Sequence, residues 1–396
     1  MNKPECLIIG AGLVGLSLAN AVKNSAWHIT LLDSATPREI NLSDPNARSI
    51  ALSYSSEKIF TEMDIWEQLA PYTTPIKTIH VSDRGHFGST RIEAAKLNVD
   101  ALGFSIPAQA LAKILQDNIK TADNITLLQP VTVTHIDTET GAISYQINNQ
   151  IVNLTADLII IADGGQSNLA SLLQITRTET DYQQTAIVAN VTLSRAHKNT
   201  AYERFTDCGP IALLPIEEQS MALVWTAKPD EAKKLLELDD ELFLLQLQQA
   251  FGFRAGYFET ITKRFTYPLK LMVSEQQVIN KALILGNAAH TLHPVAAQGF
   301  NLSLRDIHYL STELLSSSQR ALSEAAGIQG VAEILQQYIQ HRQPDQTRAI
   351  QFTDNLISIF SNNTFPITSL RSLGLTVLDN LPPLKNYLAK RAMGLK

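Results

Sequence analysis

Three glycines near the N-terminus have the spacing of a phosphate-binding turn. Gly10, Gly12 and Gly15 follow the short apolar run Glu5–Ile9 as a G-x-G-x-x-G motif. The first glycine permits a tight turn, the second lets the backbone approach a pyrophosphate, and the third allows the following helix to pack closely on the strand. The N-terminus of that helix offers unpaired N–H groups and a positive dipole end to phosphates. The motif therefore predicts a dinucleotide site.

A carboxylate stands where such a site needs one. Asp33 ends the next predicted strand, eighteen positions after Gly15. A carboxylate there accepts hydrogen bonds from ribose hydroxyls and repels a 2′-phosphate, which favours the adenosine of FAD or NAD over that of NADP. Taken alone, an aspartate at a strand end is more often a turn former. Its combination with the glycine motif favours the dinucleotide site.

The elements that must position these residues alternate between strand and helix in the first part of the chain. Expected strands are residues 5–9, 27–32, 125–129, 131–136, 142–147, 150–154 and 158–162, and expected helices are residues 13–23 and 108–120. The first three elements form a βαβ unit, which requires parallel strands and a right-handed crossover. The runs separated by Thr140-Gly141 and Asn148-Asn149 are typical of antiparallel ribbons. The continuous apolar run 158–162 is typical of a strand buried on both faces.

The pattern then changes to that of a second, sheet-based domain. From about residue 185 to 267 the segments are β-type around the turn at Cys208-Gly209-Pro210, and one charged helix is expected at about 229–251. The βα pattern returns at 282–285 and continues into helices after Gln298 and near 331–342. We therefore expect an α/β fold in which a Rossmann-like dinucleotide domain is interrupted by a β-sheet substrate domain. The expected parts are residues 1–75, 100–180 and 268–345 for the first domain, 76–99 and 181–267 for the second, and 346–396 for a C-terminal helical region.

Composition limits the class of protein. The chain has 396 residues, 45% hydrophobic and 18% charged, and its net charge is −6. This length predicts two domains, and the acidic balance excludes nucleic-acid binding through bulk charge. The apolar runs are too short to span a bilayer, and no secretory signal is visible. Two cysteines, Cys6 and Cys208, exclude a disulfide framework, and Cys6 is expected in the core. We expect a cytoplasmic protein.

Two later segments decide between nicotinamide and flavin. Asp163 and Gly164 end the apolar run 158–162 and resemble the Asp-Gly motif of p-hydroxybenzoate hydroxylase-like flavoprotein monooxygenases. The segment from Gly286 to Asp306 resembles the second FAD motif of that family. The three motifs lie in the family order and span most of the chain. The resemblance implies bound FAD, NAD(P)H as electron donor and O₂ as co-substrate.

The resemblance also assigns the site residues. Those implied in cofactor binding are Gly10, Gly12, Gly15, Asp33, Arg48, Asp163, Gly164, Gly286, Asn287, Gln298, Gly299 and Asn301. A helix that opens at Gln298 would direct its N-terminus at the pyrimidine ring of the flavin and stabilise the negative charge of reduction. Pro294 would lie beside the reactive ring edge. Arg48 matches a family arginine near the FAD phosphates, and the less favoured alternative is an ordinary surface arginine.

Three positions depart from the family pattern. Asn287 stands where most members have aspartate, Ala170 where the Asp-Gly motif usually ends in arginine, and Asp33 where glutamate is usual. The missing arginine weakens the case for a nicotinamide site more than the case for flavin. His290 and His293 have metal-ligand spacing, but no third ligand is near them in sequence, and we expect no metal.

Further segments resemble the ubiquinone-biosynthesis branch of this family. They are residues 81–86, 203–206, 209–210, 214–215, 267–269 and 286–294. The branch implies hydroxylation of a polyprenylated phenol, 2-polyprenyl-6-methoxyphenol, by a flavin C4a-hydroperoxide, with Phe205 and Pro215 in the substrate site. His293 and His86 are candidates for a base that ionises the phenol, although a structural role is more common for each. Other ubiquinone-biosynthesis enzymes are implied partners.

Other functions remain open from the sequence. An NAD-dependent dehydrogenase shares the first motif only, a flavin-dependent isoprenoid reductase shares the fold, and a non-catalytic flavoprotein scaffold is a third alternative. A related hydroxylase acting on another ring position or another phenol is also possible. The tail from residue 365 is apolar and ends with Lys385, Lys390, Arg391 and Lys396. It predicts a terminal helix packed on the core or, alternatively, a segment on the inner membrane face.

Overall fold

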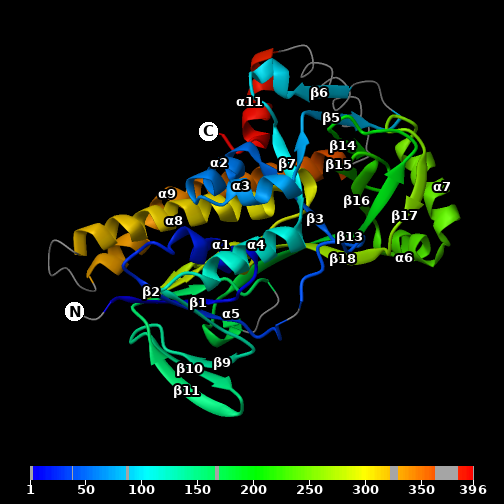
Figure 1. Cartoon of the computed structure of the whole chain (residues 1–396). Helices are drawn as coiled ribbons and strands as arrows, with labels where there is room; N and C mark the ends of the chain where they lie inside the picture. Colours follow the sequence, from blue (N-terminus) through cyan, green and yellow to red (C-terminus); the bar gives the residue numbers. More distant parts are fainter. Residues whose placement is uncertain are drawn as a thin grey trace.

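The computed structural model describes residues 3–37, 39–85, 89–165, 169–321, 329–361 and 382–395. Within these ranges the strands form four sheets, and the long helices lie along one side of the sheet that contains the N-terminal strand (Figure 1). Both ends of the described chain lie on the outside of the molecule (Figure 1).

A six-stranded sheet holds the glycine motif at its centre. In spatial order its strands are β19 (Val278–Ile279), β20 (Ala282–Ile284), β12 (Leu158–Ile161), β1 (Glu5–Ile9), β2 (His28–Leu32) and β8 (Ile125–Leu128). All neighbouring pairs are parallel except β19 with β20. In this register Ile9, Leu32 and Ile161 are neighbours at the carboxyl ends of their strands, which form one edge of the sheet. The loops that follow three strands therefore meet there, where ligands of open α/β sheets bind.

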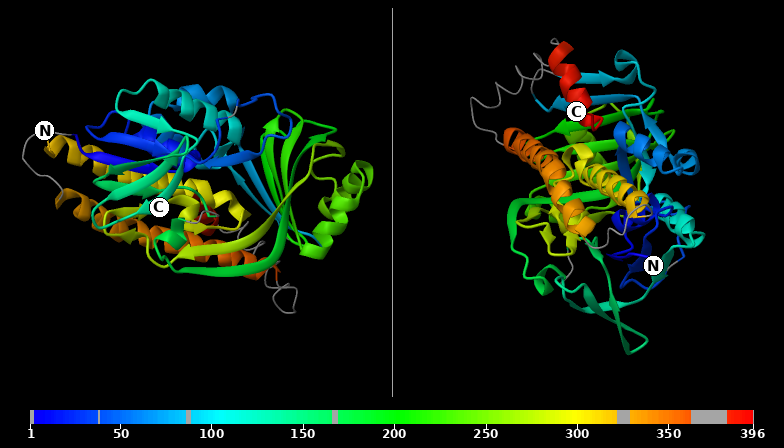
Figure 2. Two further views of the ribbon diagram at one scale, coloured as in Figure 1. Left: turned by 90° about the horizontal axis from the view of Figure 1, so that it is seen from below. Right: turned by 90° about the vertical axis from the view of Figure 1, so that its left-hand side faces the viewer.

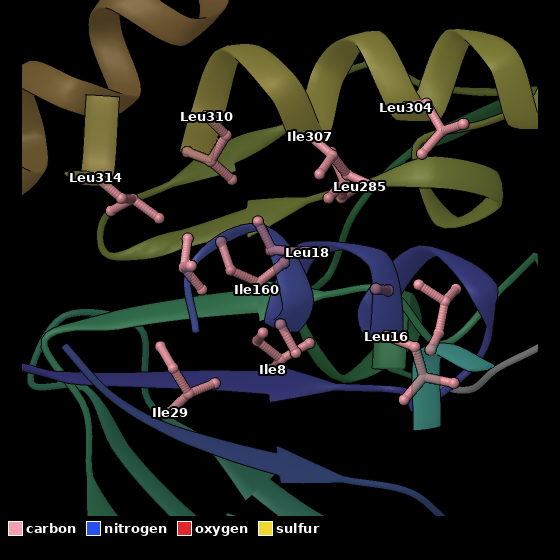
Figure 3. Packing of buried hydrophobic residues seen from close by; sticks show 14 of the residues in the cluster. Ile8, Leu16, Leu18, Ile29, Ile160, Leu285, Leu304, Ile307, Leu310 and Leu314 are labelled. Atoms are coloured by element: carbon pink, nitrogen blue, oxygen red, sulfur yellow. The ribbon is translucent and has the colours of Figure 1, made fainter. Parts of the chain in front are cut away.

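The sheet is buried on both faces, as its continuous apolar strands predict. Ile8 and Ile160 pack against the helices α1 (Leu13–Ala21), α4 (Ala108–Lys120) and α8 (Gln298–Ala321) on one face, as Figure 3 shows for α1 and α8. Leu7 and Ile161 pack on the other face against an antiparallel ribbon. That ribbon consists of β9 (Thr132–Ile136), β10 (Ala142–Ile147) and β11 (Gln150–Thr155). Cys6 is 1% exposed and lies in the core between the sheet and these helices, so its expected core position is confirmed.

A small sheet lies beside the dinucleotide sheet. It consists of β3 (Ser49–Ser53), β7 (Gly103–Pro107) and β4 (Thr74–Ile76), and it contacts α2 (Tyr54–Glu62). The remaining short helical elements are α3 (Trp66–Leu69), α5 (Leu169–Leu172), η1 (Ala70–Tyr72), η2 (Ala94–Leu97), η3 (Gly286–Ala288) and η4 (Val295–Ala297).

The largest sheet has nine strands. Eight lie in the order β21 (His290–Thr291), β18 (Phe265–Ser274), β13 (Arg177–Leu193), β16 (Ser220–Ala227), β15 (Ile211–Glu217), β14 (Thr200–Phe205), β5 (Thr78–Asp83) and β6 (Ser89–Glu93), and β17 (Phe258–Ile261) pairs with β13. Two helices cover its outer face, and its other face is turned toward the rest of the molecule (Figure 2). The long strands β13 and β18 connect the two parts of the fold, and the expected boundaries at 181 and 267 fall inside them. The division into two domains remains a proposal, with these strands as its connection.

The two covering helices correct one expectation. The expectation of a single helix at about 229–251 was wrong, because the structure has two helices, α6 (Pro229–Glu237) and α7 (Asp240–Phe251). Asp239 is extended between them, and its side chain accepts a hydrogen bond from Leu242 N at 2.8 Å. An aspartate in this geometry caps a new helix, so the chain turns between α6 and α7.

The C-terminal part is helical where it is described. α9 (Gln329–Ser361) extends well beyond the expected 331–342, with Pro344 inside it. α11 (Pro382–Ala392) is followed by Met393, which packs with Ala389 against Ile92 and Leu102. Most of the apolar tail, residues 362–381, lies outside the described residues. Among the described residues, no helix combines the length and apolar character needed to cross a bilayer. The expected α/β fold with an inserted β-sheet part and C-terminal helices is confirmed.

Candidate cofactor and active site

The glycine turn joins β1 to α1 in the way the motif predicts. Gly10 has φ +108°, and a Cβ on it would lie 2.5 Å from Ala162 O. A Cβ on Gly15 would lie 1.9 Å from Gly10 O, so the helix could not pack this closely with any other residue. A Cβ on Gly12 would meet no atom within 4 Å. The first and third glycines are therefore required by the protein itself, whereas the second leaves its surroundings open for a ligand.

The start of α1 is suited to an anion. Gly12 is its N-cap, no side chain caps it, and its first turn has no acidic residue. The first N–H groups of the helix are therefore available to a phosphate, together with the positive end of the helix dipole.

Asp33 lies against the glycine turn. Its Oδ2 accepts a hydrogen bond from Ala11 N at 2.5 Å, and its Oδ1 accepts one from Ala35 N at 2.7 Å. The carboxylate thus braces the turn. Each carboxylate oxygen can accept a further hydrogen bond, so ribose hydroxyls can still bind to Asp33.

The Asp-Gly motif lies beside the same turn. A Cβ on Gly10 would be 2.7 Å from Asp163 Cα, and Gly164 has φ +84° with open space around it. Oδ2 of Asp163 is buried and has no hydrogen-bond partner among the described residues. Burial raises the pKa of Asp163 to about 6. A buried acceptor without a partner is costly, and a hydroxyl or N–H of a bound ligand would relieve that cost. Gln166 and Ser167 lie outside the described residues.

The third motif completes the same edge. Gly286 has φ +68°, and a Cβ on it would lie 2.9 Å from the side chain of Val14, at the start of α1. Asn287 follows in η3 and is exposed. Its oxygen and NH₂ groups are therefore accessible to a ligand.

The loop before α8 is strained and well braced. Ala297 has φ +48°, a left-handed conformation that costs free energy outside glycine. Asn301 is 3% exposed, and its amide binds Ser53 N at 2.8 Å, Ser56 Oγ at 2.7 Å, Ala51 O at 2.9 Å and Ala297 O at 2.7 Å. The Asn301 side chain therefore positions this loop on β3 and α2. Gln298 is buried, and a Cβ on Gly299 would meet no atom within 4 Å.

His293 is held inside the loop. Its Nδ1 accepts a hydrogen bond from Val295 N at 3.1 Å, and its Nε2 lies 3.2 Å from Gln184 Oε1. Burial lowers the pKa of His293 to about 4. Both nitrogens are thus occupied in a neutral ring, and this geometry favours a structural role over that of a base. Pro294 is exposed beside it, and His86 lies outside the described residues.

The other expected site residues lie farther along the fold. The Arg48 guanidinium, exposed just before β3, lies 6.0 Å from the ring centroid of Tyr267 in β18. Phe205 and Pro215 are buried in β14 and β15 of the nine-stranded sheet. The carbonyl oxygen of Pro215 accepts a hydrogen bond from Ser105 Oγ in β7. His290 lies near Asp306 rather than turning toward His293.

Sequence reasoning missed Arg177. From the start of β13 its Nη1 donates to Gly165 O at 3.2 Å and its Nη2 to Ala288 O at 3.4 Å. Arg177 therefore joins the second motif to the third. The lack of an arginine at position 170 is the sequence feature that points to a different cation for the Asp-Gly loop.

Replacing Arg177 by methionine should weaken FAD binding by about 10-fold or more, because a hydrogen bond from a charged group contributes about 1.5–3 kcal/mol. Fluorescence titration of the apoprotein with FAD measures the change. Lys270→Met, which removes an exposed cation of β18 paired with Glu179, is the matched control. Equal FAD affinity in both variants would show that Arg177 does not order the loops.

The three motifs thus meet at one edge and fit a flavin dinucleotide. Open glycines at positions 12, 164 and 299, an uncapped helix start and the unpartnered Asp163 oxygen are all features that a bound dinucleotide would fill. The described residues contain no cluster of three metal-ligating side chains.

Comparison with known proteins agrees with this fit. A family model described as an FAD binding domain matches residues 3–353. Ubiquinone hydroxylase UbiL of Rhodospirillum rubrum is 29% identical over 98% of this chain and 89% of its own length. The 3-demethoxyubiquinol 3-hydroxylase of Escherichia coli is 27% identical over the whole of both chains. The predicted resemblance to ubiquinone-biosynthesis hydroxylases is confirmed.

Solved structures share the fold. That of p-nitrophenol 4-monooxygenase PnpA from Pseudomonas putida superposes with a TM-score of 0.78 over the full length of both chains at 11% identity. PqsL of Pseudomonas aeruginosa, solved with 2-aminobenzoylacetate, gives 0.77 over 94% of this chain and 99% of its own at 17% identity. The chain therefore belongs to the FAD-binding domain family and is an FAD-dependent monooxygenase.

Proposed function

We propose that this monooxygenase hydroxylates the ring of a polyprenylated phenol in ubiquinone biosynthesis, with 2-polyprenyl-6-methoxyphenol as the first candidate substrate. The observation that carries the proposal is the similarity to ubiquinone hydroxylases over nearly the entire chain. Bound FAD supplies the chemistry, taking electrons from NAD(P)H and activating O₂ for transfer of one oxygen atom to the ring.

The residues of the chain would bind, orient and shield the reactants. The start of α1 holds the pyrophosphate, Asp33 the ribose, and Asp163 with Asn287 the polar groups nearer the flavin ring. The N-terminus of α8 at Gln298 and Gly299 stabilises negative charge on the ring. Pro294 lies at the ring edge, and His293 holds its loop in place.

The substrate would bind between the flavin and the inner face of the nine-stranded sheet. That face includes Phe205 of β14. Pro215 of β15 pairs with Met221 of the core on the outer face, so this register does not support it as a substrate contact. A site between two sheets keeps water away from the reacting atoms, which prevents loss of the activated oxygen.

A polyprenyl substrate resides in membrane, and we propose peripheral membrane contact through the basic C-terminus. Lys390 and Arg391 lie in the last turn of α11, and Tyr387 is 54% exposed. Such a segment attracts anionic lipid. Unchanged recovery with anionic vesicles after deletion of residues 365–396 would remove this proposal.

The test uses the one-isoprene analogue 2-methoxy-6-(3-methylbut-2-enyl)phenol with the FAD-loaded protein. The proposal predicts phenol-dependent NAD(P)H oxidation and oxygen uptake in equal amounts, with a product carrying one oxygen atom from ¹⁸O₂. A flavin-dependent isoprenoid reductase would instead saturate the prenyl double bond without oxygen uptake. A scaffold would show neither reaction. Hydroxylation of other phenols only would change the substrate and keep the reaction class.

A further inference from the structure

The nine-stranded sheet turns one face toward the cofactor site. Ile187 and Val191 of β13 pack in the core under α6 and α7. Asn190 directly precedes Val191 in the strand, and its side chain points to the opposite face. Its Nδ2 donates to Pro45 O at 2.8 Å and to Ala47 O at 3.1 Å. Side chains of the even-numbered residues 186–190 of β13 therefore face the FAD-binding part of the molecule. This inner face is the one turned away from the two covering helices (Figure 2).

One row of residues crosses this inner face from strand to strand. Consecutive backbone partners from β13 through β16, β15 and β14 to β5 are Val188, Val224, Ala212, Glu203 and Val81. Every member of this central row is only partly buried. The residues that alternate with them on the outer face, such as Leu213 and Leu223, are 0% exposed. The central row is therefore an apolar surface that the protein does not itself cover completely, with a single carboxylate in it.

Glu203 is separated from the cations of its own strand. Tyr202 packs on Phe251 and His80 of the outer face at 5.6 and 5.7 Å between ring centroids. Arg204 also lies on that face and donates to Ser82 Oγ at 3.1 Å. Because side chains alternate along a strand, Glu203 lies on the inner face, where the ionisable residue of the adjoining strand is Asp83.

One oxygen of the Glu203 carboxyl group is buried without a partner. Its Oε1 is buried and has no hydrogen-bond partner among the described residues. Burial alone raises the pKa of Glu203 to about 7. An unpaired buried carboxyl oxygen destabilises a fold, and a ligand hydroxyl on the central row would satisfy it.

We propose that Glu203 accepts the proton of the phenol hydroxyl of the substrate. The inference rests on the proposed function and adds its missing base. In this step the phenol O–H bond breaks, an O–H bond forms on the carboxylate, and the bonding pair stays on the phenol oxygen. The proton transfer changes no oxidation state, so no oxidant is needed. The resulting phenolate donates electron density into the ring, which favours attack on an electrophilic oxygen.

The chemistry of the two groups suits this transfer. A phenol has a pKa of about 10, and an ordinary glutamate one of about 4.3. General-base catalysis is most efficient when the pKa of the base is close to the working pH. A glutamate in an apolar surface meets this condition better than His293, whose nitrogens are both engaged.

The test compares Glu203→Gln with the wild-type FAD-loaded enzyme, using the same one-isoprene analogue. The variant should bind the analogue within about 3-fold of wild type, while kcat falls by about 10²–10⁴-fold. The kcat of wild type should rise with pH to a plateau as the Glu203 carboxyl group ionises, and the variant should lack this rise. The rate of the variant should recover as the pH approaches the pKa of the phenol itself. Glu217→Gln, on exposed Glu217 of the same sheet, is the matched control and should match wild type.

The outcomes separate the two proposals. A Glu203→Gln enzyme whose kcat and pH profile match those of wild type refutes the base and leaves the hydroxylase function intact. Should the glutamine variant fail to fold, the pH profile of wild type decides, because a kcat that follows only the ionisation of the phenol itself refutes the base. A wild-type enzyme that neither binds nor hydroxylates any phenol refutes the proposed function together with this inference.

Discussion

Alanine at position 15 is expected to abolish FAD retention. The new Cβ would lie 1.9 Å from Gly10 O, far inside van der Waals contact, and its neighbour is backbone that cannot rotate away. The turn and α1 must then separate, which displaces the N–H groups that hold the pyrophosphate. A displacement of about 1 Å at a positioned group can cost about 100-fold. The flavin-to-protein absorbance ratio after gel filtration measures the loss.

Two other glycine variants sharpen this result. Gly12→Ala meets no protein atom, so it should leave the free energy of unfolding of the apoprotein unchanged and weaken FAD binding only. Gly330→Ala, in α9 and also without neighbours, should leave FAD binding unchanged and can only stabilise the helix. A Gly15→Ala protein that retains a full complement of FAD would contradict the assigned turn.

Loss of the Asp306 carboxylate should strongly destabilise the packing of α8 on α9. Asp306 is 0% exposed and binds Arg342 Nε at 2.7 Å and Gln346 Nε2 at 3.0 Å, which joins α8 to α9. Asp306→Ala leaves the Arg342 guanidinium buried with one partner fewer. Breaking a buried ion pair from one side costs about 3–5 kcal/mol. Urea denaturation measures the change in the free energy of unfolding.

The control for this variant is a pair at the surface. Asp240 is 64% exposed where it contacts Arg264 at 3.1 Å, and Asp240→Ala should cost less than about 1 kcal/mol. If Asp306→Ala costs no more than Asp240→Ala, the buried network does not hold α8 against α9.

Local patterns predicted the cofactor edge well. The spacing of Gly10, Gly12 and Gly15 fixes a turn whose geometry is set within six residues, and the structure has β1 at Glu5–Ile9 and α4 at Ala108–Lys120, as expected. The continuous apolar run before Asp163 identified a central parallel strand. These features depend on periodicity and steric fit, which sequence displays directly.

Features that depend on long-range register could not be predicted in this way. Arg177 matters because β13 begins beside two loops that are far apart in sequence, and Glu203 because alternation along β14 turns it inward. The single helix expected at 229–251 was wrong because its apolar residues continue across the break, while Asp239 forms an N-cap visible only in the folded chain.

The visible spectrum of the purified protein tests the central claim most directly. The account predicts absorbance at about 450 nm and release of FAD on denaturation. A colourless protein that cannot be reconstituted with FAD would contradict the assignment and leave a dinucleotide fold without its cofactor.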